Sequence, residues 1–308
     1  MNPGSTAPSL SQEADWEIDF YSRPILDTDG RKRWELLICS TPDANASTSP
    51  FRWLRDCPAD SVNSIWLRES IESALAAASE QGLAPPRRLR CWRGSMRAMV
   101  QRASDGLGME LVASRRCYAL QDWLRQRERD VYPQQEGYLA GPLAPAPQPL
   151  RPLAIALPEA ARGDRWSWAS LNAGALADAS DWEAGFSGLL PLPEGINPDT
   201  PVPGLRLFSQ RRPLAIAGWL AGLEPVRLEI EDDQLVLEAG LDDRWRLARL
   251  EAAEASAAQI AFAAAREQAG GLQFIAVQSD PDQPRFEGFW MLRDLPDGRG
   301  QSGPLRPA

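Results

Sequence analysis

The chain has 308 residues, of which 44% are hydrophobic and 24% charged, a composition typical of globular proteins and a length that favours two domains. It contains no histidine, and this excludes Ser-His-Asp and Cys-His catalytic systems. The net charge of −9, taken as a sum over the chain, disfavours binding to nucleic acid.

The four cysteines are Cys39, Cys57, Cys91 and Cys117, and no two of them form a Cys-x-x-Cys pair. Because histidine is missing, a metal site would need these thiols together. We therefore expect reduced cysteines in or near the first core, with no metal site, no cofactor and no catalytic residue.

Residues 1–12 have neither the basic and apolar regions of a secretion signal nor the arginines of a transit peptide, and we interpret them as a disordered tail. No window approaches the roughly 18 uncharged apolar residues that a membrane span needs. The sequence therefore predicts a soluble intracellular protein without membrane insertion.

The predicted first domain, residues 13–135, begins with period-two alternation at 15–21, a turn at 27–30 and a second strand at 34–39, which is a hairpin signature. A short third strand follows at 51–54. Ser61 is the predicted cap of a helix that runs to about Gln81. Further elements are a strand at 88–92, a short helix through Met96 and Val100, a strand at 109–114, and a helix from about 120 to 131.

The order of these elements is three strands, helix, strand, helix, strand, helix. This order predicts an α/β fold in which the first domain is a ribonuclease-H-like mixed sheet, with three antiparallel strands and parallel additions. A fold analogy of this kind carries no function by itself.

Five prolines between 139 and 152 predict a semi-rigid linker, because proline lacks the amide donor that regular structure needs. We place the linker at 136–152, a C-terminal α/β domain at 153–295 and a disordered tail at 296–308. The second domain has predicted strands at 165–171, 205–208, 226–230, 235–238, 244–250, 272–277 and 286–292, with an alanine-rich helix at about 252–269. Three strands, a helix and a strand occur in both halves, so a duplicated fold is one interpretation.

A two-metal nuclease would need carboxylates from the first strand, the first helix and the end of the fourth strand. Asp19 and either Glu69 or Glu72 supply the first two. At the third position the sequence has Arg93, so a cryptic nuclease is the weakest of the functions considered.

Positive charge is concentrated in residues 87–129, which hold eleven arginines against four acidic residues. Arg87, Arg88, Arg90 and Arg93 surround Trp92, while Arg115 and Arg116 precede Tyr118. Arginine pairs with phosphate and stacks on bases, and aromatic rings stack on unpaired bases. This pattern predicts RNA binding, although Trp92 and Tyr118 also fit core positions. We interpret Arg125, Arg127 and Arg129, which have acidic neighbours, as a solvated helix face.

Seven segments of the chain resemble a Tab/Atab-type RNA-binding family of cyanobacteria and chloroplasts. They are residues 15–27, 33–39, 114–120, 203–209, 242–245, 272–279 and 289–292. The resemblance covers about residues 15–294. It implies binding of single-stranded A/U-rich 5′ leader RNA, activation of translation of photosystem I reaction-centre messengers, and no enzymatic activity. It also implies a location in the bacterial cytoplasm or, for a processed plant protein, in the chloroplast stroma.

Members of this family end in a Trp-Leu-Leu tripeptide tied to RNA binding, and Trp290, Met291 and Leu292 occupy those positions here. On alternation, Trp290 and Leu292 lie on one face of a strand and Met291 on the other. We expect Trp290 to be partly buried and to support the RNA surface. The alternative function is a photosystem I assembly factor that contacts translation or assembly proteins without touching RNA, which the acidic second half favours.

Overall fold

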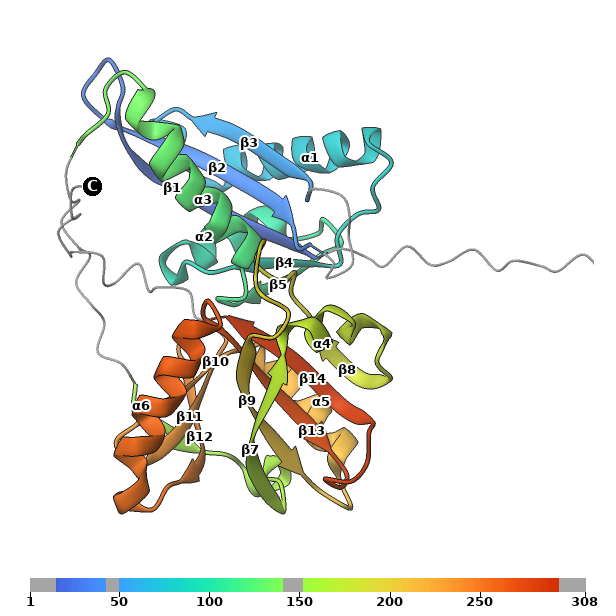
Figure 1. Cartoon of the computed structure of the whole chain (residues 1–308). Helices are drawn as coiled ribbons and strands as arrows, with labels where there is room; N and C mark the ends of the chain where they lie inside the picture. The colour runs from blue at the N-terminus through green and yellow to red at the C-terminus, as the bar shows by residue number, and fades with distance from the viewer. Residues whose placement is uncertain (1–14, 43–49, 141–151, 294–308) are drawn as a thin grey trace, which may run out of the picture. The chain divides into compact units, whose positions relative to one another are not determined.

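The computed structural model describes residues 15–42, 50–140 and 152–293 (Figure 1). These residues form two compact units. The described part of unit 1 comprises residues 15–41, 50–113 and 119–140, and that of unit 2 mainly residues 114–118 and 152–293. The two predicted tails and most of the proline-rich linker lie outside the described residues.

Unit 1 contains one sheet and its helices in the predicted order. The elements are β1 Trp16–Leu26, β2 Lys32–Ser40, β3 Arg52–Cys57, α1 Ser64–Glu80, β4 Arg88–Cys91, a 3₁₀ turn Gly94–Met96, α2 Arg97–Ser104, β5 Glu110–Ala113, α3 Tyr118–Asp130 and a second 3₁₀ turn Tyr132–Gln134. The sheet order is β3-β2-β1-β4-β5. The first three strands pair antiparallel, and β4 and β5 pair parallel, which is the predicted mixed sheet.

The helix α1 begins two residues later than predicted. Its N-cap is Asn63, whose side chain accepts hydrogen bonds from the backbone N–H groups of Ile65 and Trp66. Asparagine is as good a cap as serine, and it satisfies two of the amide groups that the first turn leaves unpaired. The assignment of Ser61 as the cap was wrong.

The sheet of unit 1 buries both faces. On one face Trp16, Ile18 and Phe20 pack with Leu67 and Ile71 of α1 in an apolar core. The alternate residues of β1, Glu17 and Asp19, are 1% exposed as well. The second face is therefore a buried polar surface, and α3 contacts it: the N–H of Leu120 donates to Glu17 at 2.8 Å. Buried carboxylates require such partners.

Unit 2 contains two sheets. Its elements are β6 Ile155–Ala156, a 3₁₀ turn Glu159–Ala161, β7 Arg165–Asn172, α4 Ala173–Ala177, a 3₁₀ turn Ala179–Asp181, β8 Ala184–Gly188, β9 Pro201–Phe208, α5 Pro213–Leu223, β10 Pro225–Glu231, β11 Gln234–Ala239, β12 Asp243–Arg249, α6 Ala252–Gln268, β13 Leu272–Gln278 and β14 Phe286–Arg293. The predicted strands and the alanine-rich helix are confirmed. The short elements β6, α4 and β8, and the helix α5, were not predicted.

The two sheets of unit 2 have the orders β10-β11-β12-β6 and β7-β9-β13-β14-β8. After the β10 to β12 meander and α6, the chain enters β13, which pairs with β9 and β14 in the other sheet. In unit 1 the corresponding fourth strand joins the same sheet as the first three. The described part of unit 2 therefore does not repeat the sheet of unit 1.

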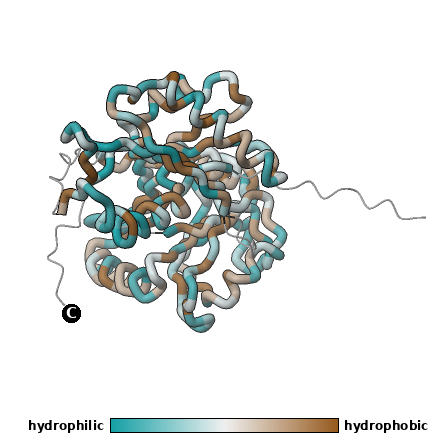
Figure 2. The backbone as a smooth tube through the Cα atoms, turned by 90° about the horizontal axis from the view of Figure 1, so that it is seen from above, coloured by the Kyte–Doolittle hydropathy of each residue, from teal (hydrophilic) through white to brown (hydrophobic). Residues whose placement is uncertain are grey.

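Apolar and polar residues are interspersed along the backbone (Figure 2). This matches strands and helices that bury one face and expose the other. Among the described residues, no helix has the length and apolar character that crossing a membrane requires.

Candidate nucleic-acid interface

The arginines of β4 are paired within unit 1. The side chains of Arg88 and Arg90 both contact the carboxylate of Asp15, at 2.7 and 2.9 Å. Arg90 is only 6% exposed. Part of the positive charge predicted for this segment is therefore neutralised by an aspartate 73 residues earlier in the chain.

Arg93 lies directly after β4 and forms an ion pair with the buried carboxylate of Asp19. Its guanidinium group lies 4.1 Å from the ring centres of both Tyr21 and Trp92, so it is sandwiched between two aromatic rings. Arg23 contacts the other oxygen of Asp19 at 2.8 Å. Burial raises the pKa of Asp19, but the charges of Arg93 and Arg23 outweigh it and the pKa is lowered.

The contacts of Asp19 argue against the nuclease hypothesis. Both oxygens of Asp19 contact guanidinium groups, which occupy the positions that a cation would need. Glu69 and Glu72 are exposed on α1, where Glu72 pairs with Arg68. In the part of the chain that the structure describes, no group of three or more acidic or cysteine side chains is placed to hold a metal ion.

Arg127 of α3 is not part of a solvated face, contrary to our interpretation of the sequence. Its side chain is 13% exposed and bonds to the fully buried carboxylate of Glu35, which also contacts Arg23 and the hydroxyl of Tyr132. Arg129 behaves as interpreted: its side chain is 74% exposed and pairs with Asp130.

Arg115 and Arg116 belong to the short segment 114–118, which groups with unit 2. Arg115 contacts Glu238 at 2.8 Å, and Arg227 contacts the same carboxylate at 2.9 Å. Burial raises the pKa of Glu238, but the two arginines reverse the effect and lower it to about 2. Arg115 is therefore one member of a structural ion-pair network around Glu238 of β11.

Arg116 is 7% exposed and donates to three backbone carbonyl groups. Its Nη1 donates to Pro225 at 2.6 Å and to Met291 at 3.2 Å, and its Nη2 donates to Gly188 at 3.2 Å. The hydroxyl of Tyr118, a residue 5% exposed, donates to the carbonyl group of Val226 at 3.3 Å. Both side chains are enclosed by unit 2, and their polar groups are used inside it.

The tripeptide lies near the C-terminal end of β14, where all three residues pair with β13 and Trp290 also pairs with Gly188 of β8. Trp290, Met291 and Leu292 are 3%, 1% and 0% exposed. Trp290 and Leu292 pack into the core that contains α5 and α6, and Met291 packs on the opposite face, which confirms the predicted alternation. Trp290 is buried more deeply than we expected, so its ring offers no face to an RNA base in this conformation.

Two glycines make room for the Trp290 indole. A methyl group added at Gly188 would lie 2.6 Å from Cδ1 of Trp290, and one added at Gly288 would collide with the six-membered ring. The indole therefore lies directly against the backbone of β8 and of its own strand. This packing makes Trp290 a structural residue of unit 2.

Of the ten residues predicted to bind RNA, only Arg87 is exposed, while Arg88, Arg93 and Arg115 are half-buried. The basic segment also contains exposed Arg97 and Arg102 on α2. Among the described residues none of Arg87, Arg97 and Arg102 forms an ion pair. The charge of these three arginines is therefore available at the surface.

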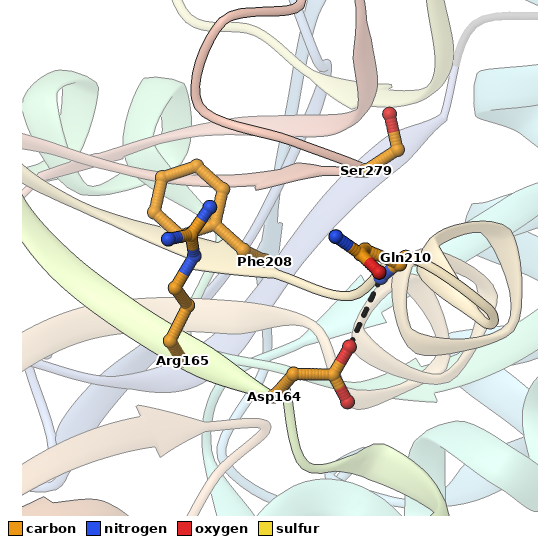
Figure 3. A pocket seen from close by; sticks show the side chains of 5 residues that line it. All are labelled: Asp164, Arg165, Phe208, Gln210 and Ser279. Atoms are coloured by element: carbon orange, nitrogen blue, oxygen red, sulfur yellow. Dashed lines mark hydrogen bonds between the residues drawn. The ribbon is translucent and has the colours of Figure 1, made fainter.

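A second basic group, which our reading of the sequence missed, lies in the segments of unit 2 that form a pocket. We call it the β9-end pocket. It has a volume of about 320 Å³ and is lined by Asp164, Arg165, Phe208, Gln210 and Ser279. Figure 3 shows Arg165 against the ring of Phe208, with Gln210 and Ser279 on the other side. Arg211 and Arg212 follow Gln210 and are exposed. The run Gln210-Arg211-Arg212 beside an aromatic residue was the available sequence signal.

Comparison with known proteins identifies the family. Residues 15–127 match the family described as RNA-binding protein Tab2/Atab2, N terminal, and residues 145–293 match the C-terminal domain of the same protein family. The chain is 35% identical over 307 residues to a protein named Protein TAB2 homolog, chloroplastic, from Zea mays, covering 94% of this chain and 74% of the relative. The chain belongs to the Tab2/Atab2 family.

A second relative, Protein TAB2 homolog, chloroplastic, from Arabidopsis thaliana, is 32% identical over 306 residues, covering 96% of this chain and 78% of the relative. The resemblance inferred from the sequence is thereby confirmed, and RNA is the partner that the family description indicates. No solved structure matches the chain. The ribonuclease-H likeness of unit 1 therefore stays a prediction, supported by its element order.

The segment 114–118 lies inside the N-terminal family match, yet it groups with unit 2. It carries Arg115, Arg116 and Tyr118, whose hydrogen bonds and ion pair lie within that unit. The boundary between the two family matches therefore does not coincide with the boundary between the two compact units.

Proposed function

We propose that the chain binds A/U-rich 5′ leader RNA and supports translation of photosystem I reaction-centre subunits. The single observation that carries this proposal is family membership over both halves of the chain, in a family described as RNA-binding. The relatives are named chloroplastic, so we further propose that the chain acts in the stroma or in a bacterial cytoplasm.

The distribution of arginine partners supports RNA binding through a limited surface. Most arginines predicted to contact RNA are engaged in unit 1 by Asp15 and Asp19 and in unit 2 by Glu238. The exposed arginines Arg87, Arg97 and Arg102 remain for phosphate contacts in unit 1. Binding to RNA through so few cations depends on ionic strength and needs further contacts for base preference.

The direct test is fluorescence anisotropy of the full chain with two labelled single-stranded RNAs of equal length, one A/U-rich and one C-rich. We expect tighter binding to the A/U-rich strand. Equal affinity for the two strands would retain RNA binding and contradict the proposed preference. Absence of binding to both would contradict the proposal as a whole.

The role in translation is tested by expressing the chain, with a chloroplast targeting peptide, in a plant mutant that lacks its own relative. Pulse labelling then measures synthesis of the photosystem I reaction-centre subunits. Restored synthesis supports the proposal. Normal synthesis of these subunits in the uncomplemented mutant, with assembly alone impaired, would favour the second candidate.

The second candidate is a factor that binds photosystem I assembly or translation proteins without contacting RNA. Unit 2 favours it through a run of exposed carboxylates between α4 and β9, made up of Asp178, Asp181, Glu183, Glu194 and Asp199. Such a group repels RNA and suits a basic protein partner.

A further inference from the structure

The β9-end pocket lies at a row of paired residues that crosses three neighbouring strands, β7, β9 and β13. Arg165 at the start of β7 is paired with Phe208 at the end of β9, and Phe208 is paired with Gln278 at the end of β13. Directly paired residues point to the same face of a sheet, so these three side chains form one line across it. Because β9 and β13 are parallel, the line lies at the carboxyl ends of parallel strands, where α/β sheets commonly bind ligands.

The pocket offers a stacking surface. The guanidinium group of Arg165 lies 5.4 Å from the ring centre of Phe208, and that of Arg206 lies 5.3 Å from the same ring. The ring is 3% exposed, whereas the side chain of Arg165 is 59% exposed. The outer face of the Arg165 guanidinium is thus available to a planar group. Arginine planes stack on nucleic-acid bases.

The pocket also offers hydrogen-bonding groups suited to a base edge. Gln210 and Ser279 supply donors and acceptors. One oxygen of Asp164 accepts from the N–H of Gln210 at 3.0 Å, which fixes the loop that carries Gln210. No described residue donates to the other oxygen of Asp164, and a carboxylate in this position accepts N–H groups but repels phosphate. The interior therefore suits a base better than a phosphate.

Two further arginines, Arg211 and Arg212, directly follow the pocket residue Gln210 and are exposed. Arg212 donates to the backbone carbonyl groups of Ala160 and Glu159 at 3.4 Å, contacts at the surface that a phosphate can replace. Arg165 has an acidic neighbour, Asp280, at 3.7 Å, but both side chains are exposed and such a surface pair is weak. A phosphate diester can replace this contact through charge-assisted bonds from arginine.

Next to this row lies a second one in which Ser167 is paired with Arg206. The Oγ of Ser167 and the Nε of Arg206 are buried and have no hydrogen-bond partner among the described residues. Unpaired buried polar groups are uncommon in folded proteins and cost stability. The two orphaned atoms beside the pocket indicate that this part of the sheet is not optimised for stability alone.

We propose that the β9-end pocket holds one nucleotide of single-stranded RNA. The base stacks on Arg165 and bonds through its edge to Gln210 and Asp164, and the adjacent phosphates pair with Arg211 and Arg212. A volume of about 320 Å³ is at the lower end of small-molecule sites and admits a single base with its sugar. The inference rests on the proposed RNA-binding function and adds the position of a base contact in unit 2.

The test compares two arginine variants of the full chain that lose the same charge. Arg165→Ala removes the stacking plane. Arg249→Ala is the matched control: its side chain is 65% exposed, it also pairs with one surface aspartate, and it lies on β12 in the other sheet. With a uridine-rich single-stranded RNA, we expect Arg165→Ala to weaken binding about fivefold or more. We expect Arg249→Ala to change it by less than about twofold.

A second measurement locates the base. RNA containing 4-thiouridine is crosslinked to the unmodified chain, which is then digested with trypsin. We expect the nucleotide on the peptide of residues 207–211, which contains Phe208 and Gln210. In the double variant Arg211→Ala/Arg212→Ala trypsin no longer cleaves after residue 211, so we expect the crosslink on the longer peptide of residues 207–227. This variant should also flatten the log–log salt dependence of binding by about 1.4.

The possible outcomes distinguish a failure of the pocket proposal from a failure of the proposed RNA-binding function. Suppose that the unmodified chain binds RNA. If Arg165→Ala then binds equally well, or if Arg165→Ala and Arg249→Ala lose affinity equally, the proposal that the pocket holds a nucleotide is wrong and the proposed function stands. If the unmodified chain does not bind RNA, both fail. Displacement of the RNA by polyglutamate as effectively as by unlabelled RNA would show a general anion site and overturn the proposal.

Discussion

The guanidinium group of Arg116 donates a hydrogen bond to the backbone carbonyl of Met291 at 3.2 Å, across 175 residues of sequence. Its other nitrogen donates to Gly188, whose Cα lies against the indole of Trp290. Two of the segments that carry the family resemblance therefore meet inside unit 2. The contact ties the backbone of the buried tripeptide to the segment 114–118.

Trp290 is expected to stabilise unit 2. Trp290→Ala removes a buried indole that packs on two glycines, and we expect a loss of about 3–5 kcal/mol in the free energy of unfolding. Thermal melting followed by circular dichroism measures it. Trp168→Ala, at a tryptophan that is 39% exposed on β7, is the control and should cost clearly less. An unchanged melting temperature in Trp290→Ala would contradict the buried packing.

Arg116 is expected to be equally structural. Arg116→Met keeps much of the side-chain volume but leaves the carbonyl groups of Pro225, Met291 and Gly188 without their buried donor, and we expect a loss of about 3 kcal/mol or more. Arg249→Met, at an exposed arginine, should stay within about 0.5 kcal/mol of the unmodified chain. Urea unfolding measures both. Equal stability of the two variants would show that the three bonds contribute little.

The stability of unit 1 is expected to depend on the protonation of Glu17. Burial raises the pKa of this carboxyl from 4.5 to about 7, although the bonds from Leu120 and Thr41 lower it. The folded state thus keeps a proton that the unfolded chain releases. This stabilisation is complete below pH 4.5 and is lost as the pH rises through about 7, a change of about 3 kcal/mol.

Glu17→Gln removes this titration, so its stability relative to the unmodified chain should improve between pH 4.5 and pH 7. Melting temperatures over this range measure the difference. Glu69→Gln, at an exposed residue of α1, is the control and should follow the unmodified chain at every pH. A constant offset between Glu17→Gln and the unmodified chain would contradict the raised pKa.

The chain is expected not to hydrolyse nucleic acid. Arg23 and Arg93 form ion pairs with the carboxylate of Asp19. Arg93 is also the residue at the position where a third metal ligand would be needed. Labelled single-stranded RNA, DNA and an RNA–DNA hybrid should stay intact with Mg²⁺ or Mn²⁺. Cleavage that disappears in Asp19→Asn would overturn this expectation.

RNA binding is expected to be salt-sensitive. The exposed arginines allow about three to five phosphate contacts, which for single-stranded RNA give a slope of log K against log salt of about −2 to −3.5. Anisotropy titrations at several salt concentrations measure the slope. A slope near zero with binding intact would exclude these arginines as the main contacts.

The sequence by itself determined most of the secondary structure, because the periodicity of apolar residues is local. It predicted every strand and helix of unit 1 in order, and the alternation of Trp290, Met291 and Leu292 across β14. It did not reveal α5, whose residues 213–223 are apolar on nearly all sides and include two glycines. Because its exposed side carries apolar residues such as Leu214 as well, this helix has no amphipathic pattern to detect.

Only the tertiary structure decided which arginines are available to a ligand. The charge of an arginine at the surface depends on its partner, and the partners of Arg88 and Arg115 are Asp15 and Glu238, 73 and 123 residues away in the chain. A count of charges within one segment cannot include carboxylates that the fold brings from elsewhere. For the same reason the row of Arg165, Phe208 and Gln278 exists only once β7, β9 and β13 are paired, since strand pairing joins residues that no local pattern connects.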